Sequence, residues 1–179
     1  MIDVVIYGDS IMKGATPEGE NRYRSVMPRF LPRLAEKYGL AVTNKARFGS
    51  TIDRGYAQLQ KDLNEQAAPY RCALVEYGGN DCDFDWAAVA EAPAAEHLPR
   101  TSMAAFQDTL EAMADGLQKK DVKPLLMPLP PIHAERYLSF ICRGGLNRVN
   151  ILKWLGEAQM IYRFQEMYSS AVLKVALRR

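Results

Sequence analysis

The stretch VVIYGDSIMKGA, residues 4–15, passes from an apolar segment into Gly8, Asp9 and Ser10 and then into a glycine-punctuated turn. Its first four residues are β-branched or aromatic and too few for a helix, so they predict a strand that ends near Gly8. Glycine permits a tight turn there, and the backbone N–H groups of a following helix would stabilise negative charge near the Ser10 hydroxyl group. Ser10 is therefore a candidate nucleophile, although Gly-Asp-Ser is also a common turn composition in which a serine only caps a helix.

Further apolar segments alternate with helical patterns along the chain. The predicted strands are residues 4–7, 41–46, 73–77 and 123–127, and the helical periods cover residues 26–38, 52–63 and 103–117. Parallel strands need a crossover, so this alternation predicts an α/β fold, a three-layer α/β/α sandwich with a doubly wound parallel sheet. Thr101 and Ser102 are candidate N-caps of the third helix. Residues 1–179 are expected to form a single domain.

Three glycine-containing turns follow the first three predicted strands. They read YGDS, RFGST and YGGNDCDFDW, and the carboxyl ends of parallel strands meet at one edge of a sheet. An acyl-transfer site needs hydrogen-bond donors aimed at the developing oxyanion. Gly49 in the second turn can supply a backbone N–H, and Asn80 in the third can supply a side-chain amide. Each is also an ordinary turn residue by itself, but together with Ser10 they predict a catalytic edge.

The sequence resembles the GDSL or SGNH hydrolases, a family of esterases and lipases with a flavodoxin-like three-layer fold. The three family motifs are matched by Gly8-Asp9-Ser10-Ile11, by Gly49 and by Gly78-Gly79-Asn80-Asp81. The resemblance implies that Ser10 is the nucleophile, and that its own N–H, the Gly49 N–H and the Asn80 amide form the oxyanion hole. It also implies a hydrolase that acts on small acyl or carbohydrate O-acetyl esters and needs no cofactor.

The general base of that family lies in a C-terminal Asp-x-x-His motif, which is absent from these 179 residues. The two histidines are His97 and His133, and neither has an aspartate three residues before it. Imidazole is the usual base at neutral pH, and His133 follows the fourth predicted strand, but a turn histidine beside two prolines is the favoured interpretation. We expect a domain truncated after the fourth strand and long helix, with impaired hydrolysis. The alternative is a non-catalytic, ligand-binding or inactive member of the same fold.

Composition and charge argue against several other classes of protein. Hydrophobic residues make up 48% and charged residues 25%, as in soluble globular proteins, and a formal charge of +2 gives little attraction for nucleic acid. No apolar run has the length of a signal peptide or a membrane span. Cys72, Cys82 and Cys142 are odd in number and widely spaced, which argues against a disulfide framework and a zinc site. We expect a cytoplasmic protein without a metal, a nucleic-acid partner or a membrane partner.

The segment DCDFDW, residues 81–86, has aspartates at alternate positions, like the start of a calcium-binding loop. The pattern fails because Trp86 stands where such a loop needs glycine and Ala92 stands where it needs glutamate. The three aspartates are expected instead to form a solvated acidic rim at the substrate entrance, with Phe84 or Trp86 packing on a sugar or acyl group. Cys82 is expected to be a small buried side chain and not a thiol nucleophile.

The remaining segments carry fewer signals. Residues 93–99 predict a surface loop and residues 128–133 a rigid turn, because both contain prolines. A long helical pattern begins at Asn147, with Gly156 as a candidate break. The strand at residues 123–127 would be left as an open sheet edge with apolar neighbours, so we expect a homo-oligomer.

Overall fold

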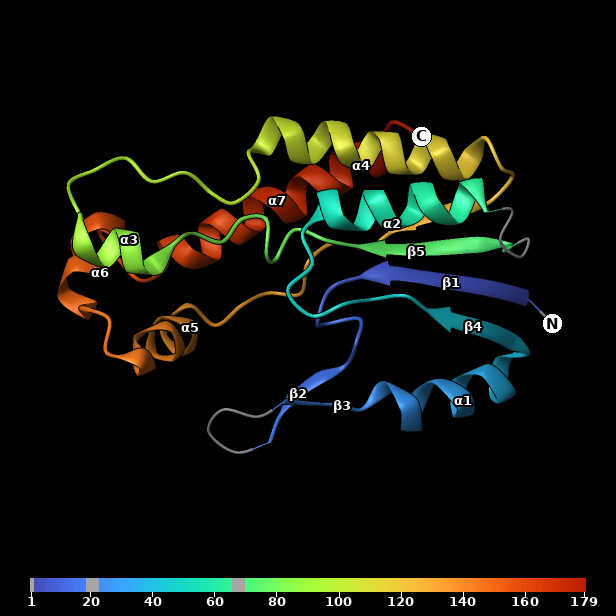
Figure 1. The fold of residues 1–179 in the computed structure, drawn as a ribbon, viewed down its shortest axis with the longest axis horizontal. Helices are drawn as coiled ribbons and strands as arrows, with labels where there is room; N and C mark the ends of the chain where they lie inside the picture. The colour runs from blue at the N-terminus through green and yellow to red at the C-terminus, as the bar shows by residue number, and fades with distance from the viewer. Residues whose placement is uncertain (1, 19–22, 66–69) are drawn as a thin grey trace.

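A parallel sheet of four strands forms the centre of the computed structural model, which describes residues 2–18, 23–65 and 70–179. The strands are β1 (Ile2–Gly8), β4 (Leu40–Asn44), β5 (Cys72–Glu76) and β6 (Lys123–Leu126), in the order β4-β1-β5-β6. All four lie where the sequence predicts strands, with bounds shifted by one or two residues. The arrows of β1, β4 and β5 point the same way in Figure 1 and β6 pairs parallel with β5, so the turns that follow the strands meet at one edge of the sheet.

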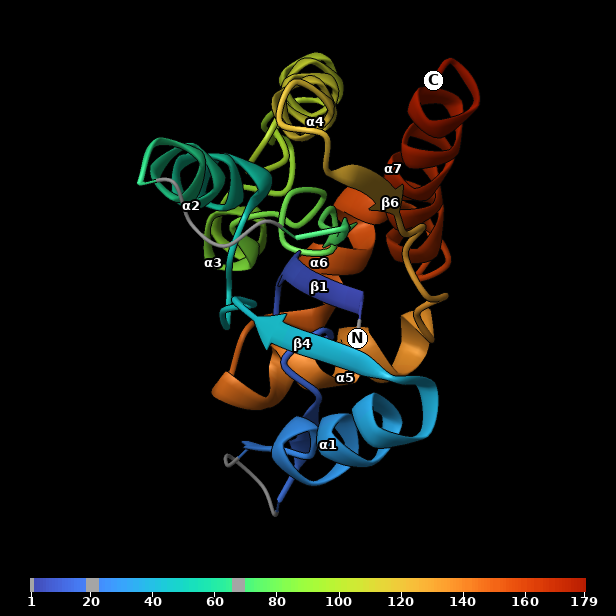
Figure 2. The same cartoon turned by 90° about the vertical axis from the view of Figure 1, so that its right-hand side faces the viewer.

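Helices cover both faces of this sheet. The helices that match sequence predictions are α1 (Met27–Tyr38), α2 (Ile52–Asn64), α4 (Met103–Gln118), α6 (Arg148–Leu155) and α7 (Met160–Leu177). Figure 2 shows α2 and α4 on one face, α1 on the other, and α7 beside β6. The prediction of a doubly wound α/β sandwich is therefore confirmed. The predicted break at Gly156 is also confirmed, because this residue has a φ of 78° and ends α6.

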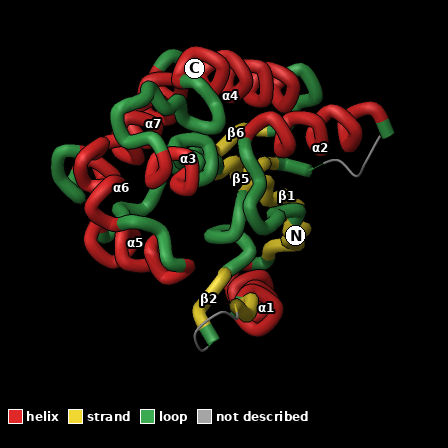
Figure 3. Tube along the Cα trace, turned by 60° about the vertical axis from the view of Figure 1, so that its left-hand side comes forward, coloured by secondary structure: helices red, strands yellow, loops and turns green. Residues whose placement is uncertain are grey.

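Several short elements were not predicted from the sequence. They are the hairpin of β2 (Ala15–Pro17) and β3 (Tyr23–Ser25), the helices α3 (Trp86–Glu91) and α5 (Ala134–Ile141), and a 3₁₀ turn (Cys142–Gly144). Figure 3 shows α3, α5 and α6 grouped with the start of α7, away from the strands. Each short element has too few residues to give a clear apolar period, so its packing partners decide its structure.

The buried side chains form two large clusters and a small one. The first fills the space between the sheet and α2, α4 and α7, and it includes Val5, Tyr7, Val75 and Phe106. The second is aromatic and joins α3, α5, α6 and α7. The carboxyl ends of β1 and β5 therefore open toward a separate helical cluster. No helix among the described residues is both long and apolar enough to cross a membrane.

Strand β6 is an edge of the sheet, as the sequence predicts. The N–H groups of Lys123 and Met127 donate to carbonyls on the β5 side, at 3.1 and 2.9 Å. In a parallel strand, the backbone N–H and C=O groups of alternate residues point to opposite neighbours. The backbone groups of Pro124 and Leu126 therefore point to the open edge. Proline has no N–H, so this edge offers an incoming strand fewer donors than an ordinary one.

Candidate active site

A cavity of about 190 Å³ lies where the turns after β1 and β5 meet the helical cluster. The turns supply its polar side and α3, α5 and α7 supply most of its apolar side. Its lining residues are Asp9, Ser10, Ile11, Gly79, Asn80, Cys82, Asp83, Phe84, Trp86, Ile132, Tyr137, Ile161, Phe164 and Gln165. Two of the three residues predicted for catalysis, Ser10 and Asn80, therefore share one cavity.

Ser10 is half-buried in a turn that Asp9 fixes. The Asp9 carboxylate accepts a hydrogen bond from the N–H of Ile11 at 2.8 Å, and the Asp9 carbonyl accepts one from Lys13 at 3.1 Å. A side chain at Gly8 would place its Cβ 2.7 Å from Met12, so the close packing under this turn requires glycine. The predicted helix directly after Ser10 is wrong: a single turn leads into the β2–β3 hairpin, and helix α1 begins only at Met27.

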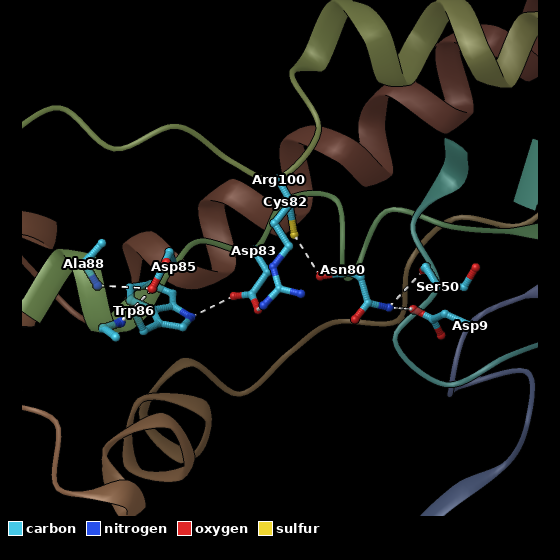
Figure 4. Close-up of polar contacts among 11 residues, drawn as sticks. Asp9, Ser50, Asn80, Cys82, Asp83, Asp85, Trp86, Ala88 and Arg100 are labelled. Atoms are coloured by element: carbon cyan, nitrogen blue, oxygen red, sulfur yellow. Dashed lines mark hydrogen bonds and ion pairs between the residues drawn. The ribbon is translucent and has the colours of Figure 1, made fainter. Parts of the chain in front are cut away.

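Asn80 links the three turns that follow β1, β4 and β5, as Figure 4 shows. Its amide nitrogen donates to the Asp9 carboxylate at 2.9 Å and to the carbonyl of Ser50 at 3.1 Å. A primary amide has two N–H hydrogens, so both are engaged in this arrangement. Asn80 therefore holds the site together, and a ligand that needs an Asn80 N–H must displace one of these acceptors.

Gly49 is exposed and is not part of the cavity lining. Its φ of 64° is in the left-handed region, and a Cβ built on it would meet no atom within 4 Å. The turn therefore needs glycine for its backbone conformation and not for space. The neighbouring residue, Ser50, is buried and provides the carbonyl that Asn80 contacts.

Two buried carboxyl groups lie beneath the turn that carries Ser10. Asp9 is 2% exposed, and Glu76, the last residue of β5, is fully buried. Burial raises the pKa of both groups, and the charge of Asp9 raises the pKa of Glu76 further, to about 8. Glu76 was missed by the sequence analysis. The available signal was an acidic residue inside the otherwise apolar segment CALVEY, next to Gly78 and Gly79.

Asp81 and Asp85 do not form the predicted acidic rim. Asp81 is fully buried, and its Oδ1 accepts hydrogen bonds from Ile52 N–H at 3.0 Å and from the hydroxyl of Thr101 at 2.7 Å. Asp85 is the N-cap of α3 and accepts bonds from two backbone N–H groups of that helix. Asp81 therefore joins distant segments of the fold, and Asp85 stabilises the start of α3.

Asp83 is the one aspartate of that segment that faces the cavity. It accepts a hydrogen bond from the indole N–H of Trp86 at 2.8 Å and lies 3.6 Å from the guanidinium of Arg100 (Figure 4). Burial, followed by the charge of Asp83, raises the pKa of Tyr137 across the cavity. Asp83 is thus a hydrogen-bond acceptor in the cavity wall whose orientation Trp86 and Arg100 fix.

Phe84 and Trp86 are 4% and 8% exposed. Their rings pack edge-to-face, and Phe84 packs in the same manner against Trp154 and Phe164. Both rings line the cavity although little of their surface is exposed, so their predicted packing on a sugar or acyl group stays a prediction. The two rings form part of a rigid apolar wall that can contact an acyl group.

Cys82 lines the cavity as a buried thiol, in agreement with the prediction of a small buried side chain. Its sulfur is 3.5 Å from the Gly79 carbonyl, and burial raises the pKa of the thiol to about 12. The thiolate is therefore scarce at neutral pH, and a thiol is a poor nucleophile. All three cysteines are free.

The two histidines lie outside the cavity lining. His133 is exposed and caps α5, where its Nδ1 accepts a bond from the N–H of Arg136 at 3.4 Å. The His97 ring contacts the carbonyl of Ala92 at 2.9 Å and packs edge-to-face on Trp154. Across residues 2–18, 23–65 and 70–179, no group of three or more His, Cys, Asp or Glu side chains is arranged to hold a metal ion.

A comparison with models of protein families matches residues 6–151 to the GDSL-like lipase/acylhydrolase family. The comparison with curated proteins found no match.

Solved structures of three enzymes are similar to this chain. The lipase/acylhydrolase from Enterococcus faecalis is 22% identical, with a TM-score of 0.55 over 93% of this chain and 73% of that chain. A catalytic mutant of Axe2, an acetylxylan esterase from Geobacillus stearothermophilus, is 18% identical, with a TM-score of 0.64 over 99% and 72%. The psychrotrophic esterase EstA from Pseudoalteromonas sp. is 16% identical, with a TM-score of 0.56 over 98% and 72%. At these identities the likeness establishes a common fold.

Proposed function

The chain belongs to the GDSL-like lipase/acylhydrolase family, and from that premise we propose that it is an esterase with Ser10 as its nucleophile. The observation that carries the proposal is the shared cavity of Ser10 and Asn80, with Asp9 bonded to both of their turns. The proposed substrates are small acyl esters or carbohydrate O-acetyl esters.

In the proposed reaction, the Ser10 hydroxyl oxygen bonds to the ester carbonyl carbon while a base, external to the cavity lining, takes the hydroxyl proton. The tetrahedral intermediate then breaks its bond to the alcohol oxygen, which receives that proton and leaves as the alcohol. Water next adds to the acyl carbon, the bond to Ser10 breaks, and the carboxylic acid leaves as the Ser10 hydroxyl group is restored. The oxyanion would accept hydrogen bonds from the N–H groups of Ser10 and Gly49 and from the Asn80 amide. Since both amide hydrogens of Asn80 are engaged, we propose that the oxyanion displaces the neutral Ser50 carbonyl, while the charge-assisted bond to Asp9 stays.

The size and lining of the cavity support a small acyl group. A volume of about 190 Å³, with Phe84, Ile161 and Phe164 on its apolar side, suits a short aliphatic chain. Asp83 and Gln165 offer polar groups to a hydroxylated alcohol. The acetylxylan esterase among the similar structures gives further support to an O-acetyl carbohydrate.

The sequence departs from the family pattern at the general base, which the family takes from its Asp-x-x-His motif. These 179 residues contain no Asp-x-x-His, and neither His97 nor His133 lines the cavity. Serine hydrolases that lose a triad member keep a residual acceleration of roughly 10³ to 10⁴ over water, from binding and the oxyanion hole. We therefore propose slow, Ser10-dependent hydrolysis by this chain.

Hydrolysis of p-nitrophenyl acetate by the wild type and by Ser10→Ala tests this proposal. Added imidazole can act as an external base, so it should accelerate the wild type more than it accelerates Ser10→Ala, whose rate also measures the direct reaction of imidazole with the ester. Equal rates for both proteins, with and without imidazole, would favour the alternative of a non-catalytic ligand-binding protein.

A further inference from the structure

Glu76 is a fully buried carboxyl group that the proposed reaction does not use. It ends β5 and lies in register opposite Gly8, one residue before Asp9. Among the described residues, neither of its carboxyl oxygens makes a hydrogen bond of normal geometry, but the N–H and the carboxyl group of Asp9 lie close enough to shift its pKa. A buried carboxylate without a donor or a cation is strongly unfavourable, so its protonation state or its environment must compensate.

The groups that face Glu76 are acidic. Burial, and then the charges of Asp9, from the turn after β1, and of Asp81, from the turn after β5, raise the pKa of Glu76. Burial, and then the charge of Glu76, raises the pKa of Tyr77. In the described part of the chain, no Lys or Arg forms an ion pair with Asp9, Glu76 or Asp81. Adjacent buried carboxyl groups cannot all ionise, so the cluster must retain a proton at neutral pH.

The hydrogen bonds of Asp9 decide where that proton lies. Asp9 accepts from Ile11 N–H at 2.8 Å and from Asn80 at 2.9 Å, and both donors favour its ionised form. At Glu76 no donor reaches normal hydrogen-bond geometry, and the nearby Asp9 N–H lowers its pKa by less than burial and the charge of Asp9 raise it. The pKa of Glu76, about 8, agrees with a group that stays neutral at pH 7.

We infer that Glu76 is a positioning residue of the proposed esterase: its protonated carboxyl group donates a hydrogen bond to Asp9, which then holds the Asn80 amide and the Ser10 turn. The inference rests on the proposed function. Glu76 itself does not line the cavity, so it acts through Asp9.

Ionisation of Glu76 has a predictable direction. An acid whose pKa is raised in the folded state binds a proton there that the unfolded chain has already lost. The stability that this proton contributes is present below the ordinary pKa of glutamate and is lost as the pH rises toward about 8. Above that pH, Glu76 and Asp9 repel, and the Asn80 amide loses its fixed orientation.

Two variants separate a positioning role from a merely structural one. Glu76→Gln keeps a neutral donor of the same shape, whereas Glu76→Leu removes the donor. Melting temperature is measured from pH 5.5 to 9 for both variants and the wild type, together with kcat and KM for Ser10-dependent hydrolysis of p-nitrophenyl acetate.

We expect Glu76→Gln to keep kcat near the wild-type value at pH 6.5, to abolish the loss of kcat above pH 8 and to flatten the fall in melting temperature with pH. Glu76→Leu should lower kcat ~10-fold or more with little change in KM, because a displaced catalytic group affects the chemical step. If Glu76→Leu fails to fold, the pH profile of Glu76→Gln decides alone.

If the melting temperature of Glu76→Gln depends on pH as that of the wild type does, the claim that Glu76 carries the proton is wrong. A Glu76→Leu variant with wild-type kcat would overturn the positioning role. If the wild type shows no Ser10-dependent hydrolysis, the proposed function fails and the positioning role fails with it, but the melting series still supports or overturns a protonated Glu76 beside Asp9.

Discussion

Asp62 and Glu76 are both buried carboxyl side chains, but their surroundings are opposite. Asp62, on α2, is 6% exposed and bonds to the Lys45 ammonium at 2.7 Å, the Tyr7 hydroxyl at 2.8 Å and the Gln58 amide at 3.0 Å. The Glu76 carboxyl oxygens make no hydrogen bond of normal geometry with the described residues, and they face the carboxyl groups of Asp9 and Asp81. The hydrogen bonds of Lys45 and Tyr7 outweigh burial and lower the pKa of Asp62, whereas burial and Asp9 raise that of Glu76.

The difference separates a carboxylate that stabilises the fold from one that belongs to the site. Asp62 connects helix α2 to β1 and to the segment after β4, and both of its carboxylate oxygens accept hydrogen bonds. In the cluster of Asp9, Glu76 and Asp81, by contrast, the ionised carboxyl groups repel one another at the point where the turns converge. Strongly raised pKa values beside a cavity are typical of functional sites.

The largest expected effect concerns Asp62, the carboxylate with hydrogen-bond donors and a cation. Lys45→Met removes the partly buried cation of this pair and leaves the buried Asp62 without its charge partner, so we expect a loss of about 3 kcal/mol in the free energy of unfolding. Urea denaturation at pH 7 measures it. Lys61→Met is the matched control, because Lys61 lies 3.7 Å from Glu65 in an exposed pair and should cost less than about 0.5 kcal/mol. Equal losses in the two variants would contradict the distinction.

Asp9→Asn should have the next largest effect, a loss of hydrolytic activity. An amide at this position places a donor against the Asn80 amide or the Ile11 N–H, so we expect kcat for p-nitrophenyl acetate to fall about 30-fold. Removing the Asp9 charge should also lower the pKa of Glu76 and weaken the fall in melting temperature between pH 6 and 8. An Asp9→Asn protein with unchanged kcat would mean that Asp9 does not hold the donors of the site.

The pH dependence of stability should have opposite signs for the two carboxyl groups. The lowered pKa of Asp62 gives stability that is present above the ordinary pKa of aspartate and is lost as the pH falls. Asp62→Asn should therefore weaken the dependence of the melting temperature on pH between 5 and 3 and leave the range from 6 to 9 unchanged. Glu76→Gln should do the reverse. A single variant that flattened both ranges would show that the two groups are coupled.

The smallest expected effect concerns the open edge at β6. We propose self-association through this edge, and since Pro124 removes one outward donor, apolar side chains such as Leu125, which is 40% exposed, should carry most of it. Sedimentation velocity at low micromolar concentration should detect an oligomer that Leu125→Glu weakens. Leu98→Glu, at an exposed loop position, is the control. A compact monomer at all concentrations would contradict the proposal.

The sheet and the turns at its carboxyl edge could be predicted because their signals are local. Four β-branched runs and the glycines beside them specify strands and tight turns, and parallel topology then brings Ser10 and Asn80 to the same edge. The structure agrees on both residues, which line one cavity. The roles of Ser10, Gly49 and Asn80 in catalysis remain predictions.

Other features depend on segments that are distant in sequence. Asp81 looks like a surface residue in the segment DCDFDW, but Ile52 and Thr101 bury it. The cavity wall on α7 is another case, because Gln165 and Phe164 follow an ordinary helical period. Glu76 has a local signal as an acidic residue in an apolar strand, but its position opposite Gly8 and beside Asp9 depends on the pairing of β5 with β1. No local pattern records such pairings.

Intact-mass and peptide analysis after a brief reaction with p-nitrophenyl acetate tests the central claim most directly. Without a cavity histidine, deacylation should be slow, so we predict that one acetyl group accumulates on Ser10 and that Ser10→Ala abolishes this adduct. Cys82 should remain unmodified, because burial keeps its thiol protonated. An acetyl group on Cys82, or the same adducts in Ser10→Ala as in the wild type, would contradict a Ser10-centred site.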